Sequence, residues 1–481
     1  MTVETKGEER GVNDVVKSPR TYPETYLRSD ERPTTGPLLE KSEVYLGSDE
    51  ISFDRFIDPA YHDLEMKAVW SKTWQVAAHE SELADVGDTV VYNIGKWSIL
   101  VVRSSETELR AYYNSCLHRG TMLKECDGPV AEFRCPFHGW TFGLDGQLTY
   151  LPEAWDFARI DQDKTRLPQV KVDIWAGWVF VNLDPDAVPL EEYLGPLRKQ
   201  YEAIPPAKRY VATHAVIHNI PANWKVTQDA FFEVYHCDPT HPQLLVSSNC
   251  YDAENSVYLD GGHMNTRMIV PIAVPGAGGH FQVTEQDVID SLYYDRVRGQ
   301  AALGALGASA EAPQLGVGEL ARPVAAKMIR KLKEAAFGAS LDGASDGEVL
   351  DAIEFSVFPN FMPWAGYQNV MSYRFRPDGN SHNRSIMDVW LLNPVMEGDL
   401  GAVPHAPEPV YIDATDGVSD VPALGRFTVV LQQDLDNLPL VQRGMETSAL
   451  SGMQLADYQE VRMRAFHQML DDYIARASAD N

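Results

Sequence analysis

Residues 114–140 read NSCLHRGTMLKECDGPVAEFRCPFHGW and contain four potential metal ligands in two pairs. Cys116 and His118 form a C-x-H pair, and Cys135 and His138 form a C-x-x-H pair after sixteen intervening residues. Thiolate and imidazole groups are ligands for zinc, copper and iron in proteins. We therefore predict that two short loops present these four side chains to a metal centre.

Two kinds of metal centre fit these ligands. In a Rieske [2Fe–2S] cluster two cysteines bind one iron and two histidines bind the other, which raises the reduction potential well above that of a plant-type cluster. The alternative is a structural Cys₂His₂ zinc site. Zinc sites usually take both cysteines from one loop and both histidines from the other, whereas each loop of this chain supplies one of each. The mixed order favours the Rieske cluster.

A second group of ligands lies in residues 223–244, which read NWKVTQDAFFEVYHCDPTHPQL. His236 and His241 are five residues apart, and on an unbroken helix this spacing rotates them by roughly 140°, so that they could not face one ion. Pro239 interrupts a helix and forces Asp238 toward an extended backbone. We therefore expect His236 at the end of a helix and His241 just beyond it, with the two side chains converging.

Acidic residues accompany these histidines. Asp229, Glu233 and His236 are spaced four and three residues apart and would share one face of the expected helix. Two histidines and one carboxylate on one side of Fe(II) form a facial triad, which leaves coordination positions open for O₂ and substrate. This segment therefore predicts a second, mononuclear metal site.

With these two motifs the chain resembles the large (α) subunit of the Rieske non-haem iron ring-hydroxylating oxygenases, from about Phe53 to Leu470. The resemblance implies that the cluster is bound by Cys116, His118, Cys135 and His138, and the mononuclear iron by His236 and His241. It also implies a carboxylate ligand from a distant C-terminal helix. The matching segment here is LQQDLDNLPLVQRGM, in which Asp434 takes the ligand position and Asp436 is the alternative.

The resemblance gives Glu233 a linking role. In this family an acidic residue three positions before the first iron histidine hydrogen-bonds that histidine and a Rieske histidine of the next subunit. By this correspondence Glu233 would join His236 to His138 across a subunit boundary, and such a carboxylate fixes tautomers and raises ligand basicity. Many members carry aspartate there and asparagine at the position of Asp229, so the bridge geometry and the role of Asp229 stay open.

The expected architecture is an α+β fold in four parts. Residues 1–50 form an extended or disordered N-terminal arm that packs on a neighbouring subunit, because they are polar and rich in Pro. Residues 51–72 form a helical segment that packs with the catalytic domain. Residues 73–187 form the all-β Rieske [2Fe–2S] domain, with short β runs between turns. Residues 188–481 form the catalytic domain, an antiparallel sheet surrounded by helices, in which 276–347 is a lid-like insertion.

Composition restricts the possible partners and location. The net charge of −28 disfavours nucleic-acid binding, because no excess of Lys and Arg exists to release counterions. No apolar run approaches the ~20 residues of a membrane span, and the N-terminus has no hydrophobic leader, so we expect a cytoplasmic protein. After two ligands are assigned, Cys126, Cys237 and Cys250 remain without framework spacing, and we expect inert thiols rather than structural disulfides.

The resemblance implies the terminal component of a multicomponent oxygenase that uses O₂, a Rieske cluster and mononuclear Fe(II). The chain has no nicotinamide or flavin fingerprint, so electrons from NAD(P)H are expected to arrive indirectly, through a separate ferredoxin and/or ferredoxin reductase. The resemblance also implies a homotrimer, or an α₃β₃ assembly with a small β subunit.

The substrate is expected to be a hydrophobic aromatic or polycyclic compound, with ring dihydroxylation favoured, as in the catabolism of aromatic hydrocarbons. This expectation rests on few charges and many apolar residues in the segments that should form the pocket wall, namely Phe231, Phe232, Val246, Met268, Phe355, Phe358, Phe361 and Trp364. Two alternatives remain. One is a monooxygenase or dealkylase of the same architecture, and the other is an electron-transfer Rieske protein with a degenerate second domain.

Overall fold

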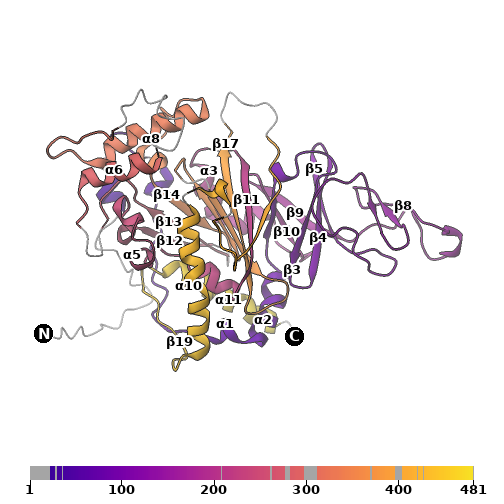
Figure 1. Ribbon diagram of the computed structural model, residues 1–481. Helices are drawn as coiled ribbons and strands as arrows, with labels where there is room; N and C mark the ends of the chain where they lie inside the picture. Colours follow the sequence, from indigo (N-terminus) through magenta and orange to yellow (C-terminus); the bar gives the residue numbers. More distant parts are fainter. Residues whose placement is uncertain are drawn as a thin grey trace.

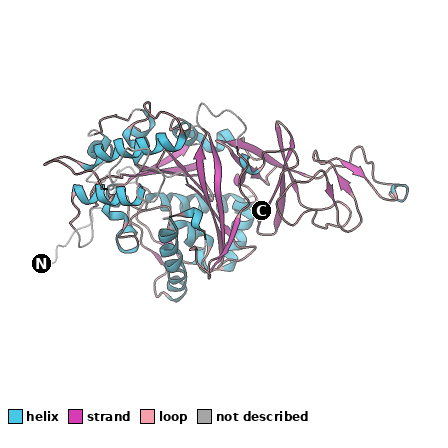
Figure 2. Ribbon diagram, turned by 45° about the horizontal axis from the view of Figure 1, so that its top comes forward, coloured by secondary structure: helices cyan, strands magenta, loops and turns pink. Residues whose placement is uncertain are grey.

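Two large β-sheets divide the chain into a smaller all-β part and a larger part of mixed helices and strands (Figures 1 and 2). This arrangement confirms the expected α+β fold. The computed structural model describes residues 22–27, 30–34, 36–206, 208–260, 263–276, 282–296, 311–368, 371–395, 404–419, 421–425 and 427–479.

The smaller part contains a six-stranded antiparallel sheet in the order β2-β10-β9-β5-β4-β3. Its strands are β2 (Gln75–His79), β3 (Thr89–Ile94), β4 (Trp97–Ser105), β5 (Glu108–Tyr113), β9 (Gln169–Trp175) and β10 (Trp178–Asn182). Successive side chains of a strand point to opposite faces. Accordingly Ile99 and Val101 of β4 join the core shared with the larger part, whereas Leu100 and Val102 pack beside Cys116 and Cys135.

A small three-stranded sheet projects from this part and carries Cys135 and His138 between its first two strands, whereas Cys116 and His118 follow β5. Its strands are β6 (Phe133–Arg134), β7 (Thr141–Phe142) and β8 (Leu148–Tyr150), and β8 lies near the far right end in Figure 1. Gly146 lies in the β7–β8 turn with φ +80°, and a Cβ there would come within 2.6 Å of Tyr112. Glycine is therefore required in this turn for both backbone conformation and space.

The larger part is built on an eight-stranded sheet in the order β12-β13-β14-β15-β16-β17-β11-β18. The strands are β11 (Arg209–Ile220), β12 (Glu254–Asp260), β13 (His263–Val270), β14 (Ala352–Ser356), β15 (Phe361–Ala365), β16 (Met371–Pro377), β17 (Ser385–Pro394) and β18 (Val410–Asp413). All pairs are antiparallel except that of β18 with β11, which is parallel.

Helices cover both faces of this sheet. On one face, α3 (Leu190–Glu202) packs against Ile353 and Phe355 of β14. The other face is covered by α4 (Trp224–Asp229), α10 (Phe427–Thr447) and α11 (Val461–Ala479), with α10 in front of the sheet in Figure 1. Among the described residues, no helix combines the length and the hydrophobicity that a bilayer-spanning segment needs.

The segment before the first sheet packs on the helices of the larger part. It consists of β1 (Ile51–Ser52), which pairs with β19 (Gly452–Met453), and of α1 (Asp54–Ile57), α2 (Pro59–Glu65) and η3 (Met66–Trp70). The Trp70 ring meets Trp224 of α4 at a centroid distance of 4.9 Å. Beside it, the buried Lys225 ammonium lies 2.8 Å from a Glu65 carboxylate oxygen.

The described part of the N-terminal arm lies on the catalytic domain of its own chain, and its packing on a neighbouring subunit stays a prediction. The Arg267 guanidinium of β13 donates to the backbone carbonyls of Pro37 and Glu40, and Ser42 N–H donates to Ser256 Oγ at 2.9 Å. A buried guanidinium has five donors, and extended backbone offers free carbonyls to accept from them. Residues 1–21 lie outside the described residues.

The region expected to form a lid contains α6 (Glu285–Arg296), α8 (Ala321–Phe337) and the start of α9 (Asp346–Leu350). These helices share an apolar cluster and lie at the upper left of Figure 1. Residues 277–281 and 297–310 fall outside the described residues.

A buried ionic network joins the two large sheets. The Arg374 guanidinium of β16 pairs with the Asp388 carboxylate through two 2.9 Å hydrogen bonds and donates to the carbonyls of Val76 and Ala77 in β2. On the other side of Asp388, the ring of His214 links this carboxylate to Glu82. Although burial raises it, the pKa of Asp388 is held well below its usual range by Arg374 and Arg376.

Arg374→Met should lower the free energy of unfolding by about 3–5 kcal/mol, because it leaves the Asp388 carboxylate buried without its closest cation. Urea titration followed by far-UV circular dichroism measures this change. Arg166→Met is the matched control: Arg166 and Asp145 form an exposed pair at 3.2 Å, and its loss should cost about 0–1 kcal/mol. Equal losses for both variants would contradict the role of Arg374.

Candidate metal centres and substrate cavity

The two loops of the first motif have the same backbone hydrogen bonds. The Cys116 carbonyl accepts from Gly120 N–H and the Cys116 N–H donates to Thr121, while Cys135 is bonded in the same way to Gly139 and Trp140. Both glycines adopt positive φ, +79° and +75°. Two similar turns therefore hold the four side chains.

Within these turns the sulfur and nitrogen ligands are separated. The Cys116 and Cys135 side chains are buried and lie close to each other. The His118 and His138 rings lie further out, with their Nδ1 atoms 3.1 Å apart. In the described parts of the chain, three ligand atoms within 4.8 Å of one another occur only at His236, His241 and Asp434. The first motif thus has two paired sets of ligands rather than four ligands around one zinc ion.

The electrostatics of Cys135 and His118 suit a two-iron cluster, whereas burial opposes deprotonation of Cys116 until a metal binds. Burial raises the pKa of Cys116. Burial also acts to raise the pKa of Cys135, but backbone N–H groups of Phe137 and His138 outweigh it and lower this pKa. Desolvation and the neighbouring His138 lower the pKa of His118, which favours a neutral imidazole. Thiolate and neutral imidazole are the ligand forms that a Rieske cluster requires.

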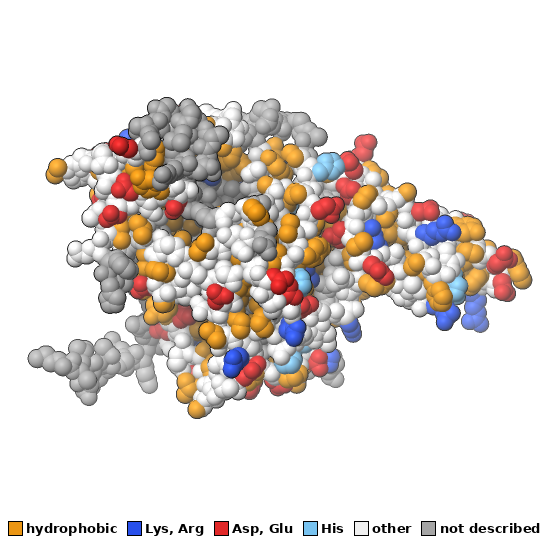
Figure 3. Space-filling view, in the orientation of Figure 1, with side chains coloured by type: hydrophobic (Ala, Val, Ile, Leu, Met, Phe, Trp, Pro, Cys, Tyr) orange, Lys and Arg blue, Asp and Glu red, His pale blue; other side chains and the backbone are white. Residues whose placement is uncertain are grey.

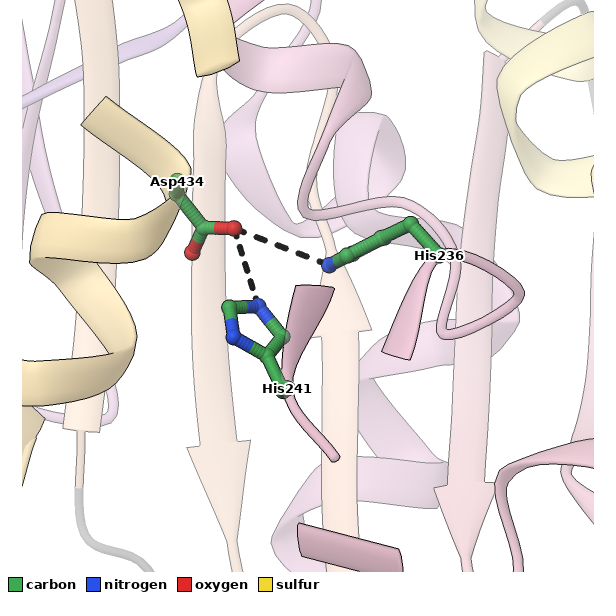
Figure 4. A group of neighbouring side chains, drawn as sticks. All are labelled: His236, His241 and Asp434. Carbon is green, nitrogen blue, oxygen red and sulfur yellow. Dashed lines mark hydrogen bonds and ion pairs between the residues drawn. The ribbon is translucent and has the colours of Figure 1, made fainter. Parts of the chain in front are cut away.

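The second site joins a loop to a distant helix (Figure 4). Asp434 Oδ1 on α10 lies 2.9 Å from His241 Nε2 and 3.7 Å from His236 Nε2, and the two imidazole centroids are 5.1 Å apart. The three side chains present their ligand atoms to one point, and the convergence expected for His236 and His241 is confirmed.

Hydrogen bonds at the opposite ring nitrogens orient both imidazoles. His236 Nδ1 lies 2.5 Å from Glu233 Oε1, and His241 Nδ1 lies 2.8 Å from Gln433 Oε1. Partners of this kind fix the tautomer of a histidine ligand and leave Nε2 free for the metal. Gln433 was not among the predicted site residues, although it directly precedes the predicted ligand Asp434.

The helix predicted through Asp229, Glu233 and His236 is wrong. Helix α4 ends at Asp229, and a new one-turn helix, α5 (Cys237–Thr240), has His236 at its N-cap and His241 at its C-cap. Pro239 lies in the first turn of α5 and does not break a helix, because its missing N–H is not needed there. Asp238 is accordingly helical, not extended.

Glu233 replaces the missing helical hydrogen bonds at this point. Its Oε2 accepts from the backbone N–H of His236 at 3.0 Å, while its Oε1 binds the imidazole of the same residue. Desolvation lowers the pKa of His236, but the bond to Glu233 outweighs it and raises this pKa overall. Asp229, whose role was open, pairs with the buried His467 at 3.0 Å.

Asp434 and Asp436 differ clearly in their surroundings. Two residues apart on α10, they point to different sides of the helix. Asp434 is 6% exposed and faces the histidines, whereas Asp436 is exposed and accepts a hydrogen bond from Gln432.

A cavity of about 320 Å³ adjoins the three side chains. Of the residues expected in its wall, Phe231, Met268 and Trp364 line it. Phe355 does not, because it alternates with Glu354 along β14 and points to the α3 face. Phe232, Phe358 and Phe361 border a separate, much smaller void, and Val246 borders neither cavity.

The sequence reasoning missed most of the other lining residues, among them Glu354, Tyr373, Cys237 and Cys250. Glu354 lies within an apolar strand, and such a buried carboxylate was the available signal. Cys237 and Cys250 are free and buried, and both border the cavity. The described lining contains no Lys or Arg.

Comparison with a solved structure defines the class of fold. The chain superposes on the quaternary ammonium Rieske monooxygenase CntA in complex with L-carnitine with a TM-score of 0.60 at 19% identity, covering 88% of this chain and 95% of that chain. This likeness shows a Rieske oxygenase fold.

Family comparisons then identify the chain. The Rieske [2Fe-2S] domain family matches residues 73–161, and the family of the ring hydroxylating alpha subunit (catalytic domain) matches residues 207–476. The chain belongs to the ring-hydroxylating α-subunit family of Rieske oxygenases, as the resemblance had predicted. This membership implies a Rieske cluster and a mononuclear iron, and the donor sets described above fit both.

Individual relatives share only part of the chain. The carnitine monooxygenase oxygenase subunit of Escherichia coli (strain K12) is 38% identical over 189 residues, which are 39% of this chain and 50% of the relative. The anthranilate 1,2-dioxygenase large subunit of Acinetobacter baylyi is 31% identical over 198 residues, 40% of this chain and 42% of the relative. The chain thus spans about half the length of the curated relatives it matches.

Asp434→Asn should leave about two irons per chain, those of the cluster, instead of about three, because a neutral amide is a poor iron ligand. Metal analysis together with the visible spectrum of the cluster measures the loss. Asp436→Asn, two residues away on the same helix, is the matched control and should retain full iron. Loss of iron from the Asp436 variant alone would reverse the assignment.

Proposed function

We propose that the chain is the terminal oxygenase component of a multicomponent Rieske monooxygenase that hydroxylates a quaternary ammonium compound. The observation that carries this proposal is the convergence of His236, His241 and Asp434 on one wall of a 320 Å³ cavity. The cluster would supply single electrons from a ferredoxin or ferredoxin reductase, and an iron at this triad would activate O₂.

The chain's own residues have separate tasks in this proposal. Cys116, Cys135, His118 and His138 hold the cluster. His236, His241 and Asp434 would hold the mononuclear iron beside the cavity, where substrate can approach it. Glu233 and Gln433 hold the Nδ1 protons and so keep both Nε2 atoms directed at the metal.

The cavity and the relatives favour the monooxygenase over the ring dihydroxylation first expected. A carnitine monooxygenase shares 38% identity with this chain in the matched region. Aromatic acids need a cation for their carboxylate, and the described lining offers none. Its carboxylates and aromatic rings instead suit a cationic group that cannot donate a hydrogen bond.

Dioxygenation of a neutral aromatic ring is the second candidate. The rings of Phe231, Trp364, Tyr373 and Phe427 border the cavity and would pack against such a substrate. The anthranilate dioxygenase relative is consistent with this chemistry, although its substrate carries a charge.

Product analysis under ¹⁸O₂ separates the two candidates. Reconstituted holoenzyme with ferredoxin, reductase and NADH is given trimethylammonium compounds and neutral aromatic compounds, and products are detected by mass spectrometry. We expect one labelled oxygen atom in the product of a trimethylammonium compound. Two labelled atoms in an aromatic product would establish the dioxygenase, and no oxygenated product with about three irons bound would leave only electron transfer.

We further propose a closed oligomer in which the cluster of one chain serves the iron of the next. Figure 1 places β8 and α10 far apart in one chain, which supports transfer between chains. A cavity of about 640 Å³ opens beside Glu233 and His236 and has an apolar rim that includes Leu440, Val441 and Met445.

Exposed aromatic side chains at the tip of the Rieske domain suit the apolar rim of this cavity. Phe137 is 58% exposed and its ring lies 4.0 Å from the surface imidazole of His138, and Trp155 is 80% exposed. Figure 3 shows hydrophobic, basic, acidic and histidine side chains together at this end of the molecule. Exposed aromatic side chains of this size are typical of protein interfaces. In the proposed assembly, Glu233 accepts from His236 in its own chain and from His138 of the neighbouring chain.

Co-expression of two inactive chains tests the transfer between subunits. Cys116→Ser removes the cluster and Asp434→Asn removes the iron, so each homo-oligomer should be inactive. In an equal mixture about a quarter of the cluster-to-iron contacts of a closed ring are intact, and product formation should return to about a quarter of wild type. Activity that stays at the level of the separate variants would refute transfer between chains.

Glu233→Gln should retain both metal centres but reduce product formation by about 10–100-fold, because the amide cannot accept from two imidazoles with the same strength. Turnover and iron content are measured together. Glu460→Gln, at the rim of the same 640 Å³ cavity, is the control and should leave turnover unchanged. Wild-type turnover in the Glu233 variant would contradict the bridge.

A further inference from the structure

One wall of the 320 Å³ cavity is formed by neighbouring strands. Glu354 of β14 is the direct cross-strand partner of Trp364 of β15, and both side chains line the cavity. The Trp364 ring meets that of Tyr373 on β16 at 87°, with centroids 6.2 Å apart. Tyr373 in turn lies 4.9 Å from Phe231. A carboxylate and aromatic rings thus lie together on this wall.

The Glu354 carboxylate is anchored from behind. Arg462 of α11 donates to its Oε1 at 2.7 Å, and the same guanidinium donates to Thr266 Oγ1 at 2.8 Å and to the Phe232 carbonyl at 2.9 Å. Arg462 is fully buried and does not line the cavity. The negative end of this ion pair is therefore the end that faces the cavity.

A carboxylate on an otherwise apolar wall is unfavourable when the cavity is empty. Burial raises the pKa of Glu354 to about 7, although Arg462 acts to lower it. An opposite charge nearby favours the ionised form. The anionic end of the pair and the negative faces of two aromatic rings would both stabilise a desolvated cation.

We propose that Glu354, Trp364 and Tyr373 form the subsite that binds the quaternary ammonium group of the substrate. This inference rests on the oxygenase function proposed above and adds the determinant of its charge specificity. A quaternary ammonium group has no N–H, so it is held by charge and by ring faces rather than by hydrogen bonds. Glu354 is a specificity-determining residue, whereas Arg462 is a positioning residue that holds its carboxylate.

The test compares two probes of nearly equal shape that differ in charge. Choline carries a trimethylammonium group, and 3,3-dimethyl-1-butanol carries a neutral tert-butyl group in its place. Binding to the full-length holoenzyme is measured by calorimetry, without turnover. We expect choline to bind at least about tenfold more tightly than the neutral probe, because only choline gains from the carboxylate and the ring faces.

Two variants locate this preference. Glu354→Gln retains an acceptor for Arg462 but removes the charge, and should bring the two affinities to within about threefold of each other. Trp364→Leu should weaken choline more than the neutral probe, because it removes one ring face.

Glu254→Gln is the matched control. Glu254 is 2% exposed and pairs with the buried Arg267 at 3.2 Å, but it does not line the cavity. This variant removes an equally buried charge and should keep the tenfold preference.

Two outcomes would overturn the inference: a wild-type enzyme that does not distinguish the probes, or a Glu354 variant with the full preference. The ¹⁸O₂ experiment is independent of this test. Oxygenation of a neutral compound with unchanged turnover in Glu354→Gln would reject the ammonium subsite and leave the oxygenase assignment in place.

Discussion

The contact of Asp434 Oδ1 with the Nε2 atoms of two histidines is the constraint on which the site depends. It joins helix α10 to a loop 193 residues earlier in the chain. The orientation of both imidazoles is set by their neighbours, because Glu233 and Gln433 bind the two Nδ1 atoms. Helix α10 carries Gln433, and the segment between α4 and α5 carries Glu233. The metal site is therefore built from the whole domain.

Charged side chains in the interior are likewise held in place by several partners each. Arg374 with Asp388, Arg462 with Glu354 and Arg267 with Glu254 are buried pairs in which a guanidinium also binds backbone carbonyls or hydroxyls. Pairing of this kind offsets the cost of desolvating each charge. The pair of Arg374 joins the two large sheets, and the pair of Arg267 holds the N-terminal arm. The pair of Arg462 orients a carboxylate toward the cavity. The three arginines come from three separate elements, β16, β13 and α11.

The two metal sites differ in how locally they are formed. The cluster loops are two similar turns within 27 residues, and each needs only its own hydrogen bonds and a glycine at positive φ. The mononuclear site needs a one-turn helix, a long helix and the strands between them. This difference accounts for the errors in the expected helix: local spacing suggested one continuous face, but the bonds of Glu233 to His236 favour a break after Asp229.

The sequence by itself determined the family, the α+β architecture and the identity of most candidate ligands, because cysteine and histidine at fixed spacing are chemically restrictive. It also distinguished Asp434 from Asp436 by resemblance, which the burial of α10 then explained. Only the tertiary structure decided which side chains face the cavity. Strand alternation points Glu354 toward the cavity and Phe355 toward α3. Which of the two faces the cavity depends on the pairing of β14 with its neighbours and not on composition.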